Sequence, residues 1–377
     1  MQAPPAVVYQ TSMNIRPRRC ILTALSITAL SITALSITAL SITALSLTGS
    51  AAAQTTDVLL IPDSGPIAGR VWALSPVDGS VITNSFIPGD TRLTQPIQII
   101  DSGRGTLLVT DEVAKSVFEY SARGNYLATI ASGLEGSYGI CLRDGNAYVT
   151  SGFGAGVGGK IYRIALDGSA PVVFSDWTGI GDPRGIVPYG AGFLVGNSVD
   201  DDLEVVGSTG SVNPVPFYNS DGIISINFPQ QIVDIGNGNL MVAGFSAPWG
   251  VYFFDSGAFV YAVYRAPEVY LSPRGTRMLE NGEILYTGGT RIDRFSTKTY
   301  ANTNIVNQAG ASFRWVTRYT PPTPCPADVN GDRDVNANDL ATILSGWGTT
   351  DASADINGDG TVSALDLAIL LGNWGPC

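Results

Sequence analysis

A short segment recurs six times along the chain, and its spacing limits the folds that the sequence can adopt. Each copy has an anchor that is usually proline, one variable residue, in five copies a glycine or glutamine, and a β-branched residue. The copies stand at 96–99, 137–140, 183–186, 229–232, 273–276 and, in degraded form, 313–316, so the steps are 41, 46, 46, 44 and 40 residues. Two more apolar runs follow each of the first five copies, and a glycine turn precedes a further run after four of them. Four strands in about 44 residues is the pattern of one β-propeller blade.

The two ends of this repeat region are incomplete in complementary ways. Residues 57–87 contain the later strands of a blade without its first strand, whereas 313–319 is a first strand with no blade after it. Joining them completes a ring of six blades and removes the exposed sheet edges at both ends. The 44 glycines and 22 prolines of the chain fit an architecture rich in turns. We therefore predict an all-β fold over 54–319, a six-bladed β-propeller closed by strands from both ends.

The repeat also resembles a known family. Residues 96–126 begin with Pro-Ile-Gln-Ile, continue with Leu-Leu-Val-Thr-Asp and end with Gly-Asn-Tyr, and they look like an NHL-type propeller repeat. The resemblance extends over most of 57–319 and implies the fold more than an activity. NHL-like propellers include protein-binding modules and metal-dependent lactonase relatives.

The first 53 residues have the pattern of a secretory signal peptide. Three arginines within 16–19 precede an uncharged run at 21–47, which contains four tandem Ile-Thr-Ala-Leu-Ser units, and Ser50 and three alanines follow. This pattern predicts cleavage after Ala53 and a secreted protein that is extracellular or held at the cell surface. The run is long enough for an uncleaved transmembrane anchor, which is the alternative.

Charge and composition exclude several classes of function. The chain has a formal net charge of −11, and loss of residues 1–53 would remove three arginines, leaving 18 basic against 32 acidic residues, or −14. Such a surface would repel nucleic acid and anionic membranes. The chain has no histidine, which excludes Ser-His-Asp and Cys-His catalysis and histidine-based zinc sites.

A shorter duplication occupies residues 325–377, after a stiff proline-rich linker at 320–324. Residues 327–348 and 354–375 agree at 13 of 22 positions. Each copy places oxygen-bearing residues at positions 1, 3, 5, 7, 9 and 12 of an EF-hand-like loop, the ligand pattern for calcium, with position 7 using its carbonyl and position 9 acting through water. The predicted ligands are Asp328, Asn330, Asp332, Asp334, Asn336 and Asp339 in the first loop, and Asp355, Asn357, Asp359, Thr361, Ser363 and Asp366 in the second.

Each loop leads into an amphipathic helical segment. The apolar residues follow the spacing i, i+3, i+4, i+7, so we expect one apolar face per helix and burial of the two faces against each other. They are Leu340, Ile343, Leu344 and Trp347, and Leu367, Leu370, Leu371 and Trp374. The module has eight aspartates and one arginine, a net charge of −7 that bound cations would offset. Cys325 and Cys377 flank it, and export favours a disulfide between them, whereas Cys141 is expected to be a lone buried thiol.

This duplicated module resembles a type I dockerin. The resemblance implies two bound calcium ions, a cohesin-like protein or cell-surface partner, and secreted complexes that are often polysaccharide-degrading. The sequence departs from the family pattern at two places. Arg333 stands where the first loop turn expects glycine, and Ala337-Asn338 and Ala364-Leu365 replace the frequent Ser-Thr pair that reads the partner.

The residue after each anchor predicts a ligand site on the propeller. Equivalent positions at the start of the innermost strands converge on the axis, and they hold Tyr138, Arg184, Gln230, Arg274 and Arg314. Arginine forks suit carboxylates and sulfates, so an extended anionic or neutral glycan is the expected ligand. Acidic runs at 111–112 and 200–202 are expected on the same face, where they would either neutralise the arginines or stay solvated. Trp177 and Trp249 would either plug this face or stack against a sugar.

Three functions remain open at this stage. The first is a non-catalytic recognition or structural propeller with a calcium-dependent docking module, in which no residue is catalytic. The second is an extracellular glycan-active hydrolase or lyase of polysaccharide catabolism, which would have to use carboxylates. The third is a metal-dependent lactonase-like propeller, for which no axial set of ligands can be assigned.

Overall fold

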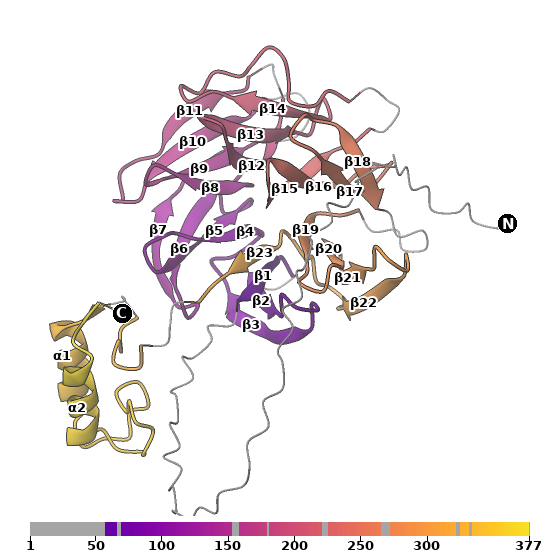
Figure 1. Ribbon diagram of the computed structural model, residues 1–377. Helices are drawn as coiled ribbons and strands as arrows, with labels where there is room; N and C mark the ends of the chain where they lie inside the picture. Colours follow the sequence, from indigo (N-terminus) through magenta and orange to yellow (C-terminus); the bar gives the residue numbers. More distant parts are fainter. Residues whose placement is uncertain are drawn as a thin grey trace, which may run out of the picture.

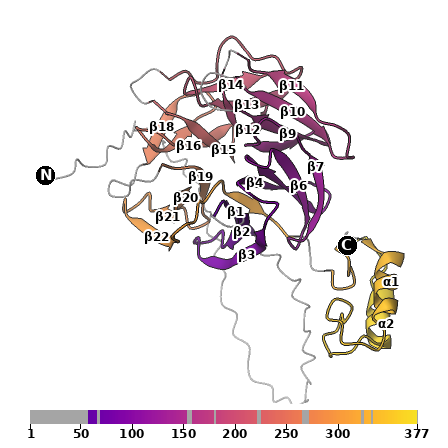
Figure 2. The same cartoon turned by 180° about the vertical axis from the view of Figure 1, so that it is seen from behind.

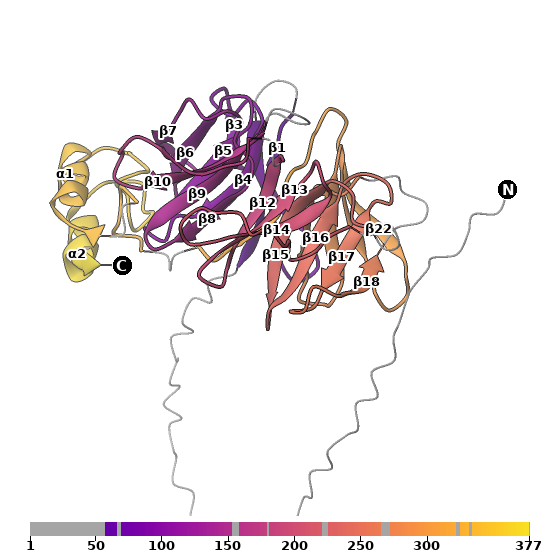
Figure 3. The same ribbon diagram turned by 90° about the horizontal axis from the view of Figure 1, so that it is seen from above.

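The structure is a computed structural model, and it describes residues 57–65, 69–152, 158–178, 181–220, 225–264, 272–321, 325–331 and 334–376. Six antiparallel sheets surround a common centre (Figure 1), and Figure 3 gives the same ring from its edge. The predicted signal peptide and its cleavage point lie outside the described residues. No helix within the described ranges has the length and apolar character needed to cross a membrane.

Each sheet runs from one innermost strand to an outermost strand at the rim (Figures 1 and 2). From the axis outward, three of them are β23 (Thr317–Tyr319), β1 (Val58–Asp63), β2 (Gly69–Leu74) and β3 (Val81–Asp90); β4 (Pro96–Asp101), β5 (Thr106–Asp111), β6 (Ser116–Ser121) and β7 (Tyr126–Ala131); and β8 (Ile140–Arg143), β9 (Asn146–Ser151), β10 (Lys160–Ala165) and β11 (Val172–Asp176). The others are β12 (Pro183–Tyr189), β13 (Gly192–Asn197) and β14 (Asp202–Val206); β15 (Pro229–Gly236), β16 (Asn239–Gly244), β17 (Gly250–Phe254) and β18 (Val260–Tyr264); and β19 (Gly275–Met278), β20 (Ile284–Gly288), β21 (Arg291–Phe295) and β22 (Asn302–Asn307).

The ring is closed by strands from both ends of the repeat region, as the sequence predicts. β23 is the innermost strand of the sheet that contains β1, β2 and β3, and it pairs antiparallel with β1 so that Tyr319 lies opposite Val58. A separate bridge joins Phe313 to Asp63 further along the same edge. The predicted six-bladed β-propeller is therefore confirmed.

One blade differs from the predicted four strands. β12, β13 and β14 form a three-stranded sheet, and only isolated bridges, Val206 to Val212 and Leu203 to Tyr218, stand where the fourth strand was expected. Pro214 and Pro216 fall in this segment. Proline has no N–H to donate to a strand ladder, so the segment cannot continue the sheet.

The glycine of the repeated segment has a structural reason at the axis. A Cβ at Gly139 would lie 2.5 Å from the carbonyl oxygen of Arg184, and one at Gly185 would lie 2.3 Å from that of Gln230. Real side chains do not tolerate such approaches, so only glycine lets the inner strands of neighbouring blades come this close. Where the repeat has glutamine, its side chain makes the link instead, because Gln98 Oε1 accepts a hydrogen bond from Ile140 N at 2.9 Å.

Deleting residues 313–377 is expected to open the ring and to lower the Tm of the propeller by at least about 10 °C relative to a chain that ends at Tyr319. The lost segment buries Phe313, Trp315, Val316 and Tyr319, and each such side chain stabilises the fold by about 1.5–3 kcal/mol. Differential scanning calorimetry of the two truncated chains makes the comparison. Equal Tm values would show that β23 does not close the ring.

The C-terminal module contains two short helices that lie side by side (Figures 1 and 2). α1 spans Ala337–Ser345 and α2 spans Ala364–Gly372, and β24 (Asp334–Val335) pairs with β25 (Gly375–Pro376). Asn336 and Ser363 cap the helices in matching capping boxes. The core is small and consists of Ala327, Val335, Ile343, Ala354, Val362 and Leu370.

The expectation that the two apolar helix faces bury each other is wrong for half of each face. Ile343 and Leu370 are fully buried, but Leu344, Leu371 and both tryptophans are exposed. Each helix ends before its tryptophan, since α1 stops at Ser345 and α2 at Gly372. The fourth position of the predicted stripe therefore leaves the helix face, and the core fully buries one apolar residue of each helix, with Leu340 packed against it.

Candidate functional site

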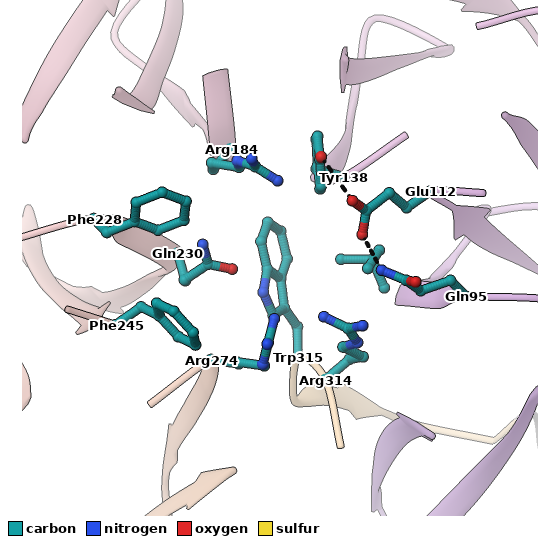
Figure 4. Close-up of a pocket in the computed structure, with 11 residues that line it drawn as sticks. Gln95, Glu112, Tyr138, Arg184, Phe228, Gln230, Phe245, Arg274, Arg314 and Trp315 are labelled. Carbon is teal, nitrogen blue, oxygen red and sulfur yellow. Dashed lines mark hydrogen bonds between the residues drawn. The ribbon is translucent and has the colours of Figure 1, made fainter. Parts of the chain in front are cut away.

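A pocket of about 290 Å³ opens at the centre of the ring (Figure 4). All five residues predicted from the position after the anchor line it, which brings together side chains from five blades. The complete lining is Gln95, Ile97, Glu112, Tyr138, Arg184, Phe228, Gln230, Phe245, Arg274, Arg314 and Trp315. These residues lie at or just before the start of an innermost strand, or just after the end of the next strand, so they share one end of the propeller.

Hydrogen bonds between neighbouring blades fix the backbone that carries these side chains. The hydroxyl of Thr150 donates to the carbonyl oxygen of Arg184, and the hydroxyl of Thr287 donates to that of Arg314. The hydroxyl of Thr110 does the same for the carbonyl oxygen of Tyr138, at 2.7 Å. The pocket residues are thus held by buried bonds in the inner part of the ring, and their side chains are placed before any ligand arrives.

Arg184 is held by the protein itself. Its Nη2 lies 2.6 Å from Oδ2 of Asp182, a carboxylate that is almost fully buried. Its guanidinium carbon lies 3.6 Å from the ring centroid of Tyr138 and 5.3 Å from that of Phe228. An ion pair and two aromatic faces therefore fix this side chain, and much of its charge is neutralised.

Arg274 and Arg314 differ, because neither forms an ion pair among the residues that the structure describes. Arg274 stacks on Phe245 at 4.6 Å, and Nε of Arg314 donates to Oγ of Ser64 at 3.1 Å. Burial first, and the neighbouring Arg314 second, lower the pKa of Arg274 to about 10. Burial also lowers the pKa of Arg314, which is 7% exposed. Both guanidiniums stay protonated at neutral pH, and the protein offsets their charge only in part.

Glu112 supplies the one carboxylate that lines the described pocket, on the side opposite Gln230 (Figure 4). Its Oε1 accepts a hydrogen bond from the Tyr138 hydroxyl at 2.9 Å, and its Oε2 accepts one from the amide of Gln95. Burial raises the pKa of Tyr138, and the Glu112 carboxylate adds to that rise. Within the described residues, the side-chain amide of Gln230 has no hydrogen-bond partner, so it is available to a ligand.

Within the acidic runs, Glu112 is the member that lines the described pocket, and the aspartates bond elsewhere. Asp111 accepts hydrogen bonds from its own loop, including Ala114 N at 2.7 Å. Asp201 accepts from Phe228 N at 2.7 Å, and Asp202 accepts from Ser220 N at 2.9 Å. These carboxylates cap nearby loop N–H groups, which removes them from the pocket.

The aromatic contribution to the pocket differs from the expectation. Trp177 is fully buried in a core cluster that includes Ile161 and Ile186, and neither Trp177 nor Trp249 is among the residues that line the described pocket. The aromatic surface comes from Phe228, Phe245 and Trp315 instead. Phe228 directly precedes an anchor, as Gln95 does, and Phe245 follows a second strand, as Glu112 does. Comparing two further repeat positions, the residue before the anchor and the residue after the second strand, would have found Phe228 and Phe245.

The predicted calcium ligands that the structure describes lie in the two loops before α1 and α2 or in the first turn of these helices, whereas Asp332 and Arg333 lie outside the described residues. Asp339 and Asp366 are buried at the start of α1 and α2, where Asp339 Oδ1 accepts from Val329 N and Asp366 Oδ1 accepts from Asn357 N. In the second loop Gly360 has φ of +89°, the left-handed backbone that the loop turn needs. Backbone hydrogen bonds from Asn357 above all, and from Ser363, lower the pKa of Asp366, so this carboxylate stays charged.

The loop carboxylates bond mainly to their own backbone. Asp355 Oδ1 accepts from Gly358 N at 2.9 Å and its Oδ2 accepts from Gly360 N at 2.8 Å. Across the described ranges, no three acidic side chains come together as a metal-binding group. The donors are nevertheless aspartate, asparagine, serine and carbonyl oxygens, the hard ligands that calcium prefers, so the donor set fits this ion. The predicted Cys325–Cys377 disulfide involves a residue outside the described part, whereas Cys141 is free and buried as expected.

Comparison with known proteins separates the two parts of the chain. Residues 326–372 match the dockerin type I domain, a family whose members bind calcium and dock onto cohesins. No curated protein sequence matches the chain.

Solved structures match the propeller. A chain of the nidogen/laminin complex has a TM-score of 0.56 and 16% identity, with 71% of this chain and 100% of that chain covered. A protein of unknown function from Bacteroides caccae has a TM-score of 0.52 and 15% identity, with 70% of this chain and 98% of that chain covered. At these identities the likeness establishes the fold alone. The chain thus joins a six-bladed β-propeller to a C-terminal type I dockerin domain.

Proposed function

We propose that this is a secreted, non-catalytic recognition protein, with a dockerin domain that attaches it to a cohesin-like or cell-surface partner and a propeller that carries the ligand site. The observation that carries the proposal is the dockerin match over 326–372, because this domain type implies docking. The signal-peptide pattern of residues 1–53 supports export, and the acidic net charge of −11 argues against nucleic acid as a partner.

The docking surface would consist of the exposed apolar side chains of the module. Trp347 is 45% exposed and Trp374 is 51% exposed, and they are equivalent positions of the two copies. Leu344 and Leu371 are exposed at another equivalent pair, and Leu365 is exposed where the family often has threonine. Exposed apolar side chains gathered on one small module are typical of a protein-binding surface.

The module would hold two calcium ions. In the first loop the ligands would be Asp328, Asn330, Asp332, the carbonyl of Asp334, Asn336 and Asp339; in the second they would be Asp355, Asn357, Asp359, the carbonyl of Thr361, Ser363 and Asp366. The domain borders would be 1–53, 54–319, 320–324 and 325–377. A disulfide between Cys325 and Cys377 would tie the ends of the module together.

The pocket supports recognition better than catalysis. A glycosidase needs two carboxylates at a set separation, whereas Glu112 is the single carboxylate among the described lining residues. The arginines, Gln230 and the aromatic rings are groups that bind and orient a ligand. We therefore assign no catalytic residue, and polysaccharide binding rather than breakdown is the proposed role of the propeller.

Changing Trp347→Ala together with Trp374→Ala is expected to weaken binding to a type I cohesin at least about 30-fold, since each truncated anchor residue can cost 2 kcal/mol or more. Both tryptophans are changed because the two copies are equivalent. Isothermal titration with a panel of type I cohesins in calcium buffer measures the affinity, and Phe259→Ala, an exposed aromatic on the propeller, is the control. Unchanged affinity would contradict the proposed surface, and failure of every cohesin to bind would contradict the docking function.

A further inference from the structure

Building on the proposed recognition role, we propose that the central pocket binds one hydroxylated carboxylate about the size of a single sugar ring, as a free uronic acid or as the end unit of an acidic glycan. The charge, the hydrogen-bonding groups and the size of the pocket each limit which ligands can bind.

The charge balance of the pocket favours a monoanion. Arg184 and Asp182 form an ion pair and cancel each other. Among the remaining described lining residues, Arg274 and Arg314 bring two positive charges against the one negative charge of Glu112, which leaves one positive charge to be offset. A ligand with one carboxylate neutralises this excess, while a dianion would exceed it.

The geometry of the arginines favours a planar acid group. The guanidinium carbon of Arg274 lies 4.6 Å from the ring centroid of Phe245, and no described residue forms an ion pair with its edge. Arg314 uses Nε on Ser64, and its terminal nitrogens have no partner among the described residues. A carboxylate can accept hydrogen bonds from two N–H groups on the edge of a guanidinium in a bidentate arrangement.

The other polar groups require hydroxyls on the ligand. Glu112 accepts one hydrogen bond at each oxygen and retains lone pairs for more. Gln230 is 5% exposed, and its amide offers both a donor and an acceptor that no described residue uses. A purely apolar acid would remove water from these groups without replacing its hydrogen bonds, which is unfavourable.

The shape of the pocket limits the ligand to one ring. Its volume of about 290 Å³ is just below the range of pockets for drug-sized ligands. Trp315 lies in the middle of the ring of lining side chains (Figure 4), is 1% exposed and packs with Ile97 and Tyr138. This indole closes the central channel, so a polymer cannot thread along the axis and only an end can enter.

A ligand series measured by isothermal titration on the full chain in calcium buffer tests the inference. The series consists of galacturonate, glucuronate and mannuronate, the neutral sugar and methyl ester that match the tightest of these, cyclohexanecarboxylate, and the trimer of the tightest uronate. We expect one uronate to bind per chain. Relative to the tightest uronate, the neutral sugar and the ester should bind at least 30-fold more weakly, and cyclohexanecarboxylate at least 10-fold more weakly. The trimer should bind within threefold of the monomer. Equal binding of the neutral sugar, or a trimer more than 10-fold tighter, would overturn the proposal.

A variant pair tests the role of the hydroxyls. Gln230→Leu should weaken uronate binding about 10-fold and leave cyclohexanecarboxylate binding unchanged, while the exposed Gln308→Leu should change neither. An equal loss of affinity for uronate and for cyclohexanecarboxylate in Gln230→Leu would contradict hydroxyl recognition. Cohesin binding is measured on the same samples. If the protein binds cohesin but no uronate, this inference is overturned and the docking function stands. If it binds neither cohesin nor uronate, the inference and the docking function are both overturned.

Discussion

Removing calcium is expected to unfold the C-terminal dockerin domain and to abolish docking, while the propeller keeps its Tm. The two helices have nine residues each, shorter than the ~12–15 residues at which isolated helices become even marginally stable in water. Among the described residues, Ile343 and Leu370 are the only fully buried ones in their shared core that are larger than valine. Seven net negative charges repel one another within the module. Metal binding therefore supplies much of the folding free energy, as it does in other small metal-binding domains.

Circular dichroism in calcium and in excess EDTA measures the helical signal, and calorimetric titration counts the ions. We expect two ions and tighter binding at the second loop, where Gly360 adopts φ of +89° and the equivalent residue of the first loop is Arg333. A side-chain residue in this conformation costs about 1–2 kcal/mol. Asp366→Asn should selectively weaken the second loop. A helical signal unchanged by EDTA, or a tighter first loop, would contradict the assignment.

Replacing Arg274 and Arg314 together by glutamine is expected to weaken the binding of acidic ligands at least 100-fold. Hydrogen bonds to charged groups contribute about 1.5–3 kcal/mol each, and the pair supplies the uncompensated positive charge of the pocket. The same change should leave the Tm unchanged or raise it, because burial and mutual repulsion, which lower the pKa of Arg274 to about 10, are relieved.

Arg184→Gln is the control that separates binding from stability. This arginine is paired with the buried Asp182, and removing one partner of a buried ion pair typically costs 3–5 kcal/mol. We therefore expect a clearly lower Tm for Arg184→Gln and no decrease in Tm for the double variant. A double variant that melts lower than the wild type would show that Arg274 and Arg314 serve the fold rather than a ligand.

The sequence predicts the ring and the pocket because both follow from the same repeated segment. The residue after the anchor has the same place in every blade, so Tyr138, Arg184, Gln230, Arg274 and Arg314 had to converge once the blades closed. The partners of those side chains do not repeat. Asp182, which neutralises Arg184, lies just before an anchor in a single blade, and its role depends on side-chain geometry that no pattern encodes.

Two other differences between prediction and structure come from where elements end. Pro214 and Pro216 replace the outer strand of one blade with isolated bridges. In the dockerin domain, helix periodicity correctly predicts burial of Ile343 and Leu370 but extends it to residues beyond the helix ends. Trp347 and Trp374 are exposed for that reason, and they become the proposed docking surface.

The central claim is that the C-terminal dockerin domain attaches to a partner while the central pocket of the propeller holds an acidic ligand. Surface plasmon resonance tests both at once, with the full chain captured in calcium on an immobilised type I cohesin and the tightest-binding uronate flowed over it. The account predicts a 1:1 response for the captured wild type and almost none for the captured chain with Arg274→Gln and Arg314→Gln. Equal responses from the two captured chains, or no response from either, would contradict it.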